Sequence, residues 1–543
     1  MNLPIRITAS NAILIGAFVT QTIFLIIIHH ARRYEINEDA VSYIRIAQYY
    51  LNFNVDLMIS GYWGPLLSWL IAPWLLFFQT PLYAGHAAMI LSAGVFSLGS
   101  YRMLRALKLP DAAVLAGTWI CALVSVGWSI GLIAPDLLEA GLLCFGVGLI
   151  LSDSWPRNGA TSFFSGAIFG IAFLAKAVAL PVSLLIIVCF ACQHAVVGAP
   201  PFRFIMRSFL LTLAGLMVVT GPWIYVLSTH YGNFVFSTSG PINHALVGPT
   251  DVDRYHPSFR TFHQPVAGRI TSWEDPLPEI YEHWSPLDNW GSAKHQAQLI
   301  YANARDIGRI LAEFDWLGLG LVSALLGYIF CSPWRETLRA EYWRWAFIPV
   351  LCGSAIYLPV YADSARYFWP IFPFLLAAAF GFTGHLANTL PTSRFAKAFL
   401  SIGLVTISFA VAQEPRLRQS FSPVKFSEYE LALKIAERLD NKELVGPIAS
   451  VGWYEIGYYA AFILGVPWYG NILEASTINE VLDSNARLIF SPRGDLTPLV
   501  EGQSSGRSLP EDELILCDDP PSGAYFDIFV IENGALLPIC SGR

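Results

Sequence analysis

Long apolar runs separated by short polar stretches dominate the first three quarters of the chain. A membrane-spanning helix needs about 20 mostly apolar residues. Eleven stretches meet this requirement: 10–28, 82–101, 112–132, 137–153, 159–175, 177–193, 208–229, 314–331, 345–361, 367–387 and 397–412. The segment 61–79 is also apolar, but glycines and prolines interrupt it, so we expect it to be re-entrant or interfacial. The pattern predicts an α-helical polytopic membrane protein with about 11–13 transmembrane helices.

Lysine and arginine residues gather in alternate connections between these spans. They occupy the regions 102–108, 157, 203–207, 335–344 and 394–397. Short loops rich in positive charge stay in the cytoplasm. The N-terminus is therefore expected inside, and the connections 29–60 and 230–313 outside, with Arg32 and Arg33 against the rule. We expect a bacterial-type inner or plasma membrane, with a periplasmic or extracellular C-terminal domain.

The polar tail 413–543 has a different pattern. Helical spacing over 428–439 and 454–464 alternates with strand-like runs at 446–452, 485–492, 513–517 and 525–533. This alternation predicts a small soluble, extracytoplasmic α/β domain that follows a transmembrane catalytic domain of residues 1–412. Cys517 and Cys540 flank the last strand-like run, and either a disulfide or two buried thiols would suit them.

Composition narrows the class of protein. Charged residues make up 13% of the 543 residues and hydrophobic residues 55%, whereas soluble chains carry about 25% charged residues. This excludes a water-facing globule and a disordered chain. The net charge of −7 argues against a nucleic-acid partner. The eight cysteines show no zinc-ligand spacing.

Acidic residues stand at the outer ends of two predicted helices. Glu38 and Asp39 follow Asn37 and open an amphipathic stretch. They suit the first turn of an interfacial helix, where acids favour the helix dipole, or a general base held at the membrane surface. Asp136 follows Pro135 in a very short outer turn. It can cap the next span and serve a site at once, because an acid at membrane depth usually has a partner or a role.

Basic residues lie on the same predicted face. Lys176 is the only charged residue between 159 and 193. It either extends to the interface or binds an anionic headgroup. Arg366, before Tyr367, either pairs with Asp363 or binds a phosphate through its forked guanidinium.

The outer loop 230–313 contains His244 and four further histidines, together with acids and three tryptophans. No HxH or HExxH spacing occurs. These histidines could therefore form a metal site together with other loops, lie at the surface, or contact a substrate.

Two acids and two cations on one outer face suit group transfer from a lipid phosphate. A carboxylate would accept a proton from the acceptor hydroxyl, and cations would stabilise the departing phosphate.

These motifs, in this order, resemble the GT-C membrane glycosyltransferases. The likeness is to the branch that holds the lipid A aminoarabinose transferases, the protein O-mannosyltransferases and the galacturonosyl transferases. The first-loop Lys-Pro pair of the aminoarabinose enzymes is missing, and Trp63-Gly64 stands before Pro65. The matching segments are Glu38-Asp39 with Tyr43, the Pro/aromatic segment 62–69, Pro135-Asp136-Leu137, the lysine segment 173–181, Asn243-His244, and the Arg-Tyr-Pro segment 366–373.

The resemblance implies a GT-C fold and an inverting transfer of a hexosyl or pentosyl group. The donor would be a polyprenyl-phosphate sugar, and the acceptor a hydroxyl of a lipid, glycan or protein. Asp39 would be the base, with Glu38 and Asp136 tuning it or positioning the acceptor. The implied substrate-binding residues are Tyr43, Arg45, Trp63, Lys176, His244, Arg366 and Tyr367. Among these, Arg45, Lys176 or Arg366 would bind the phosphate of the donor. The resemblance implies no definite cofactor. A divalent metal, which some members of the family use, would be compatible with these site residues.

Two other classes compete with the enzyme. A transporter or flippase for a lipid-linked or anionic substrate should place polar residues at mid-membrane, often in repeated halves, whereas the charges here gather at one surface. A scaffold protein would leave Asp39, Asp136 and Lys176 unexplained. The sequence therefore favours the glycosyltransferase.

Overall fold

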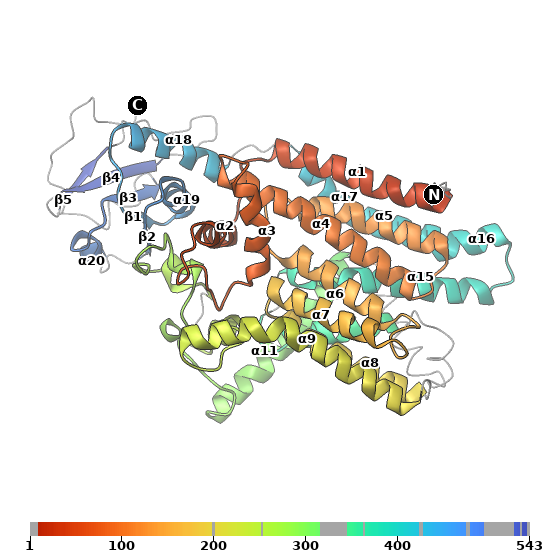
Figure 1. Cartoon of the computed structure of the whole chain (residues 1–543). Helices are drawn as coiled ribbons and strands as arrows, with labels where there is room; N and C mark the ends of the chain where they lie inside the picture. The colour runs from red at the N-terminus through yellow and green to blue at the C-terminus, as the bar shows by residue number, and fades with distance from the viewer. Residues whose placement is uncertain are drawn as a thin grey trace, which may run out of the picture.

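The computed structural model describes residues 9–197, 201–250, 254–314, 345–361, 364–422, 427–473, 478–492, 526–532 and 535–539. Long helices form an elongated bundle, and a small sheet domain lies at one end of it (Figure 1). Asp363, Cys517, Cys540, the strand-like run 513–517 and all but the first residue of the predicted span 314–331 lie outside the described residues.

The apolar runs form helices close to their predicted bounds. The helices of the bundle are α1 (Ala9–Ala31), α4 (Pro81–Ala106), α5 (Asp111–Trp128), α6 (Asp136–Ile150), α7 (Gly159–Ala175), α8 (Ala179–Val197), α9 (Phe202–Tyr231), α14 (Phe347–Tyr357), α15 (Phe372–Thr389), α16 (Arg394–Ala398), the π-helical turn η6 (Phe399–Gly403) and α17 (Leu404–Phe421). Within the described part of the chain, seven helical stretches are long and apolar enough to cross a membrane. The protein is an integral membrane protein, and the predicted fold class is confirmed.

Small residues let these helices approach closely. A Cβ atom on Gly99 of α4 would lie 2.0 Å from the Gly141 carbonyl oxygen of α6, and one on Gly166 of α7 would lie 1.8 Å from the Thr212 carbonyl oxygen of α9. Close backbone contact of this kind is how helices associate in lipid, where the hydrophobic effect does not drive them together. A Cβ on Gly146 of α6 would likewise lie 2.6 Å from the Phe169 ring of α7, so α6 and α7 also pack closely against each other.

Two shorter helices lie at the end of the bundle next to the sheet domain: α2 (Glu38–Leu51) and α3 (Pro65–Leu75). The interrupted segment 61–79 is thus partly helical, with Pro65 at the first helical position, where its missing N–H costs nothing. A Cβ on Gly64 would lie 2.4 Å from the carbonyl oxygen of Ala175. Only glycine lets the start of α3 rest on the end of α7, one residue before Lys176.

The connection 230–313, which was predicted to lie outside, is folded onto these helices rather than extended. It contains α10 (Ser239–Ala245), η1 (Pro257–Phe259), η2 (Ser272–Glu274), η3 (Pro278–Ile280) and the long helix α11 (Trp290–Phe314). Tyr49 of α2 donates a hydrogen bond to the buried carboxylate of Glu274 at 2.7 Å, and Arg269 pairs with buried Asp275 at 3.2 Å. Buried charges with such partners anchor the loop over α2.

The predicted α/β domain is present. Its elements are α18 (Glu428–Asn441), β1 (Ile448–Val451), α19 (Glu455–Leu464), β2 (Trp468–Ile472), α20 (Ile478–Leu482), β3 (Leu488–Pro492), β4 (Phe526–Glu532) and β5 (Ala535–Pro538). The strand order is β2-β1-β3-β4-β5, with β1 parallel to β2 and β3, and the other pairs antiparallel. The strands β2 and β5 were not expected from the sequence.

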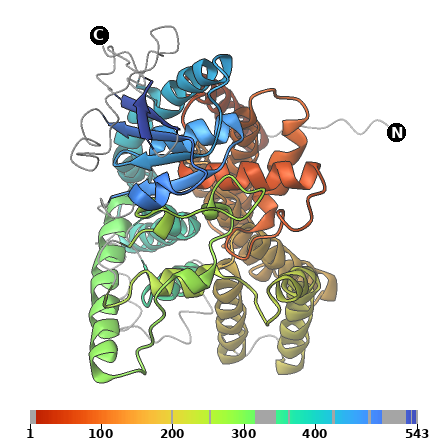
Figure 2. The ribbon, with the colours of Figure 1, turned by 90° about the vertical axis from the view of Figure 1, so that its left-hand side faces the viewer.

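The connection 230–313 also borders the sheet. Backbone N–H groups of His263 and Trp468 donate at 2.7 Å to the carbonyls of Tyr469 and Ile270. Figure 2 shows the loop, in yellow-green, passing beneath the blue sheet domain. The connection 230–313, α2 and the C-terminal α/β domain thus meet at one end of the bundle.

Candidate functional site

Two ion pairs lie at this end of the bundle. The first joins Arg366 Nη1 to Asp39 Oδ2 at 2.8 Å, and the second joins Lys176 Nζ to Asp136 Oδ1 at 2.6 Å. Asp39 is the second residue of α2, and Arg366 belongs to η5 (Ala365–Ile371). Asp136 begins α6, and Lys176 caps the C-terminus of α7. Four of the predicted site residues therefore come from four separate segments.

Tyr367 connects the two pairs. The Lys176 Nζ atom lies 4.5 Å from the centroid of its ring, and the Arg366 guanidinium carbon lies 5.3 Å from it. A cation near an aromatic face is attracted by the ring quadrupole. The Asp136 side chain is only 2% exposed, whereas those of Lys176, Arg366 and Asp39 are 22%, 24% and 14% exposed. The two cations and Asp39 thus remain accessible to a ligand.

The connection 230–313 holds the Asp39 carboxylate in place. Trp273 Nε1 donates to Asp39 Oδ1 at 3.3 Å. The carbonyl oxygen of Trp273 in turn accepts from Trp63 Nε1 at 2.7 Å and from Ser42 Oγ at 3.1 Å. The rings of Trp63 and Tyr43 pack edge to face with centroids 5.1 Å apart. The predicted residues Trp63 and Tyr43 therefore belong to an aromatic cluster behind the acidic side chain.

Glu38 faces the C-terminal α/β domain. Tyr454 donates its hydroxyl to Glu38 Oε1 at 3.2 Å, and Tyr458 donates to the Glu38 carbonyl oxygen at 3.1 Å. Burial raises the pKa of Glu38 above its ordinary value, and the neighbouring charge of Asp39 acts in the same direction. Glu38 consequently holds a proton more readily than a solvated glutamate does.

A cavity of about 560 Å³ opens beside Asp39 and Arg366, within the about 300–1,000 Å³ usual for small-molecule sites. It receives side chains from the start of α2, the end of α5, η5 and α17. Its polar and aromatic lining residues are Asn37, Glu38, Asp39, Trp128, Tyr361, Ser364, Arg366, Tyr367, Trp369 and Arg416. The cavity combines acids that can accept a proton with guanidinium groups that can bind an anion.

A narrow pocket lies on the other side of Tyr367. Its walls are mostly apolar and come from α6, α8, α14 and α15, including Leu143, Val182, Ile186 and Phe374. Buried Glu139 also lines it. Glu139 was not among the predicted site residues, although it stands three positions after Asp136 and therefore on the same helix face.

Arg45 and His244 lie apart from the ion pairs. Arg45 donates to Gln48 at 2.7 Å and to Tyr49 at 3.1 Å, in contact with the anchored outer loop. The His244 ring stacks on Trp284 with centroids 4.4 Å apart, and its Nε2 atom lies 3.1 Å from Gln296 Oε1. None of these contacts reaches Asp39. The predicted substrate roles of Arg45 and His244 stay predictions.

Among the described residues, no group of three or more His, Cys, Asp or Glu side chains is arranged to hold a metal ion. Glu38 and Asp39, the acids nearest the cavity, are engaged by Tyr454 and Arg366. The compatibility with a divalent metal stays an expectation.

Solved structures of two kinds of protein resemble this fold. ArnT from Cupriavidus metallidurans in the apo state matches 99% of this chain and 100% of its own, with 13% identity and a TM-score of 0.57. The same enzyme bound to undecaprenyl phosphate gives 12% identity, the same coverage and a TM-score of 0.55. The apo oligosaccharyltransferase of Archaeoglobus fulgidus matches 88% of this chain and 69% of its own, with 12% identity and a TM-score of 0.52.

The chain has the GT-C fold. No protein-family model and no curated protein matches the sequence. At such low identity, structural likeness demonstrates the fold alone. The expected GT-C architecture is therefore confirmed, while the roles of individual residues depend on the geometry described above.

Proposed function

We propose that this protein is a glycosyltransferase that moves a sugar from a polyprenyl-phosphate-linked donor to a hydroxyl acceptor at the outer face of the membrane. The observation that carries this proposal is the Asp39–Arg366 pair at the mouth of the cavity, beside the Lys176–Asp136 pair. The ArnT structure with undecaprenyl phosphate supports the choice of a lipid phosphate, since this chain shares that fold over nearly its whole length.

Asp39 is the general base in this reaction. Its carboxylate takes the proton of the acceptor hydroxyl as the hydroxyl oxygen attacks the anomeric carbon of the donor sugar. The new glycosidic bond forms while the bond from the anomeric carbon to the phosphate oxygen breaks, and the electron pair leaves with the polyprenyl phosphate. Attack opposite the leaving group inverts the anomeric configuration. The Trp273 hydrogen bond orients the carboxylate for this step.

Lys176 and Arg366 stabilise the departing phosphate. Asp136 occupies one of the three donor positions of the Lys176 ammonium, and Asp39 occupies part of the Arg366 fork. Both side chains keep N–H groups for an anion. Fixed cations that point to where negative charge develops contribute more to the rate than mobile ones in water.

The donor lipid lies on the Tyr367 side of the site. The apolar side chains of α8, α14 and α15 next to Tyr367 suit contact with the first isoprene units, while the pocket itself, of about 20 Å³, has room for only about one water molecule. Tyr367 lines both this pocket and the cavity, and Lys176 Nζ lies 4.5 Å from the centroid of its ring. The acceptor then approaches through the polar cavity beside Asp39. Glu38 and Asp136 position the acceptor or tune the base.

The test is donor turnover by the purified protein in detergent. Wild type, Asp39→Asn and the control Asp56→Asn, an exposed acid of the connection 29–60, are incubated with a panel of polyprenyl-phosphate sugars and a mixture of lipid, glycan and peptide hydroxyl acceptors. Wild type and Asp56→Asn should release polyprenyl phosphate, and Asp39→Asn should be slower by about 10²–10⁴-fold, the usual contribution of a general base. Equal release by Asp39→Asn would exclude this base. Binding of donors without release from any of them would favour a transporter or flippase.

A further inference from the structure

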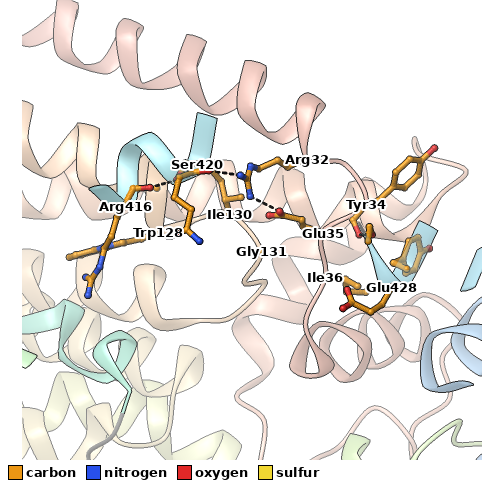
Figure 3. A pocket seen from close by; sticks show the side chains of 14 residues that line it. Arg32, Tyr34, Glu35, Ile36, Trp128, Ile130, Gly131, Arg416, Ser420 and Glu428 are labelled. Atoms are coloured by element: carbon orange, nitrogen blue, oxygen red, sulfur yellow. Dashed lines mark hydrogen bonds and ion pairs between the residues drawn. The ribbon is translucent and has the colours of Figure 1, made fainter. Parts of the chain in front are cut away.

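A second cavity adjoins the first. It measures about 500 Å³ and lies between the end of α1, the α5–α6 turn, the end of α17 and the start of α18. The residues Gly127, Trp128, Ile130 and Arg416 line both cavities, so the two share a boundary. Figure 3 shows this second cavity, with Arg32 and Glu35 joined at one side and Arg416 and Glu428 on either flank. The proposed reaction at Asp39 makes no use of it.

The charges around this cavity are already balanced. Arg32 pairs with Glu35 at 2.5 Å and also donates to the carbonyl oxygens of Gln419 and Ser422. Arg416 pairs with Glu313 at 3.0 Å. Two arginines and two glutamates line the walls together with Gln419, Ser420 and Ser427. An anionic ligand would find no uncompensated positive charge here, and desolvating it would be costly.

The lining instead matches a ligand rich in hydroxyl groups. The Glu35 and Glu428 carboxylates and the side-chain oxygen of Gln419 accept hydrogen bonds, and the guanidinium groups and the Gln419 amide nitrogen donate them. The Ser420 and Ser427 hydroxyls already donate to the carbonyl oxygens of Arg416 and Tyr34. A neutral sugar presents both functions on every ring. A lipid chain would need apolar walls, and a single protein hydroxyl at Asp39 would not use a second polar cavity.

We infer that the acceptor is a neutral saccharide of two or more units, free or as the headgroup of a lipid. This inference rests on the proposed function. The terminal sugar lies in the first cavity with its hydroxyl at Asp39, and the next sugar lies in the second cavity among Glu35, Gln419 and Glu428. The acceptor is thus recognised by its sugars, on the side of Asp39 opposite the donor lipid.

The test is saccharide binding by the full chain in detergent. Labelled protein is applied to an array of neutral and anionic glycans, both single sugars and longer chains. Gln419→Trp would fill the second cavity, because this side chain lines that cavity alone, whereas the neighbouring Arg418→Trp serves as the matched control on an exposed side chain. Wild type and Arg418→Trp should retain neutral chains of two or more units, and Gln419→Trp should bind them at least about tenfold more weakly.

A second pair of variants keeps the inference testable if Gln419→Trp fails to fold. Glu428→Gln should weaken the same glycans, and Glu437→Gln, exposed on the same helix, should not. Retention of anionic glycans only, single sugars only, or no glycan would overturn the inference. Equal binding by all variants would also overturn it. Release of polyprenyl phosphate by wild type, in the presence of a mixture of saccharide, lipid and peptide hydroxyl acceptors, is measured in parallel. If release occurs without glycan binding, the inference fails and the transferase stands; if neither occurs, both fail.

Discussion

The hydroxyl of Tyr454 donates a hydrogen bond to Glu38 at 3.2 Å, although 416 residues separate the two in the chain. Two further tyrosines of α19 reach the same stretch, since Tyr458 donates to the carbonyl of Glu38 and Tyr459 to that of Ile36. The C-terminal α/β domain therefore holds the first turn of α2, which carries Asp39. It supports the proposed catalytic residue rather than standing apart from it.

Replacing Tyr454 by Phe should slow donor turnover without unfolding the protein. The variant keeps the ring and loses a hydrogen bond to a charged group, which is worth about 1.5–3 kcal/mol. If even part of this energy positions the α2 turn, kcat should fall by about tenfold, the change that about 1.4 kcal/mol produces. Polyprenyl phosphate release measures the effect, and Tyr301→Phe, on an exposed ring of α11, is the control. Unchanged turnover would mean that Tyr454 only attaches the domain.

Stability should depend on pH through a second acid of this interface. Burial raises the pKa of Glu455 from 4.5 to about 7, and the charge of Glu38 adds to the shift. Because the folded state favours the protonated form, the stabilisation is complete below pH 4.5 and is lost as the pH rises through about 7. Glu455→Gln should therefore flatten the fall in unfolding temperature over this range. The exposed Glu437→Gln should keep the wild-type slope, and an equal slope in Glu455→Gln would contradict the assignment.

The helices were predictable because the length of an apolar run is a local property. The run 159–175 became α7 with the same bounds, and 177–193 became most of α8. The long helix α11 was harder to predict from the sequence, because it lies within the connection 230–313 and buries only one of its faces. The strand β2 is five residues long and contains Gly470 and Asn471, which strands seldom contain, so its sequence gave little strand signal.

The candidate site could be predicted as a group of residues but not as a set of contacts. The predicted orientation of the membrane spans placed Asp39, Asp136, Lys176 and Arg366 on the same face of the membrane. Nothing in the local sequence determines which acid pairs with which base, and Arg366 pairs with Asp39 of a distant segment. Trp273 and Tyr454 contact the acids from 234 and 416 residues away. Such contacts depend on the packing of the loop and the soluble domain, which no short motif encodes.

The Lys176–Asp136 pair allows stability and function to be separated. Lys176→Met leaves the buried Asp136 carboxylate without its cation, which should cost about 3–5 kcal/mol of unfolding free energy. The double variant Lys176→Met with Asp136→Leu removes both charges and should regain most of that stability. Neither variant should turn over donor at more than a small fraction of the wild-type rate, because the phosphate loses a cation. Unfolding temperature in detergent and polyprenyl phosphate release are measured on the same samples. Full activity in the double variant would show that Lys176 has a structural role only.

Gly64 provides a steric test of the same region. A Cβ added there would lie 2.4 Å from the Ala175 carbonyl oxygen, beside Lys176, so the start of α3 or the end of α7 must move. Gly64→Ala should destabilise the protein by about 1–3 kcal/mol, as overpacking does, and should raise KM for the donor by displacing the lysine. Gly94→Ala is the matched control, since its Cβ would meet no atom within 4 Å. An alanine in place of that helical glycine should be neutral or stabilising by about 0.5–1 kcal/mol. If Gly64→Ala lowers stability but leaves KM unchanged, Lys176 is not held in place by the contact between α3 and α7.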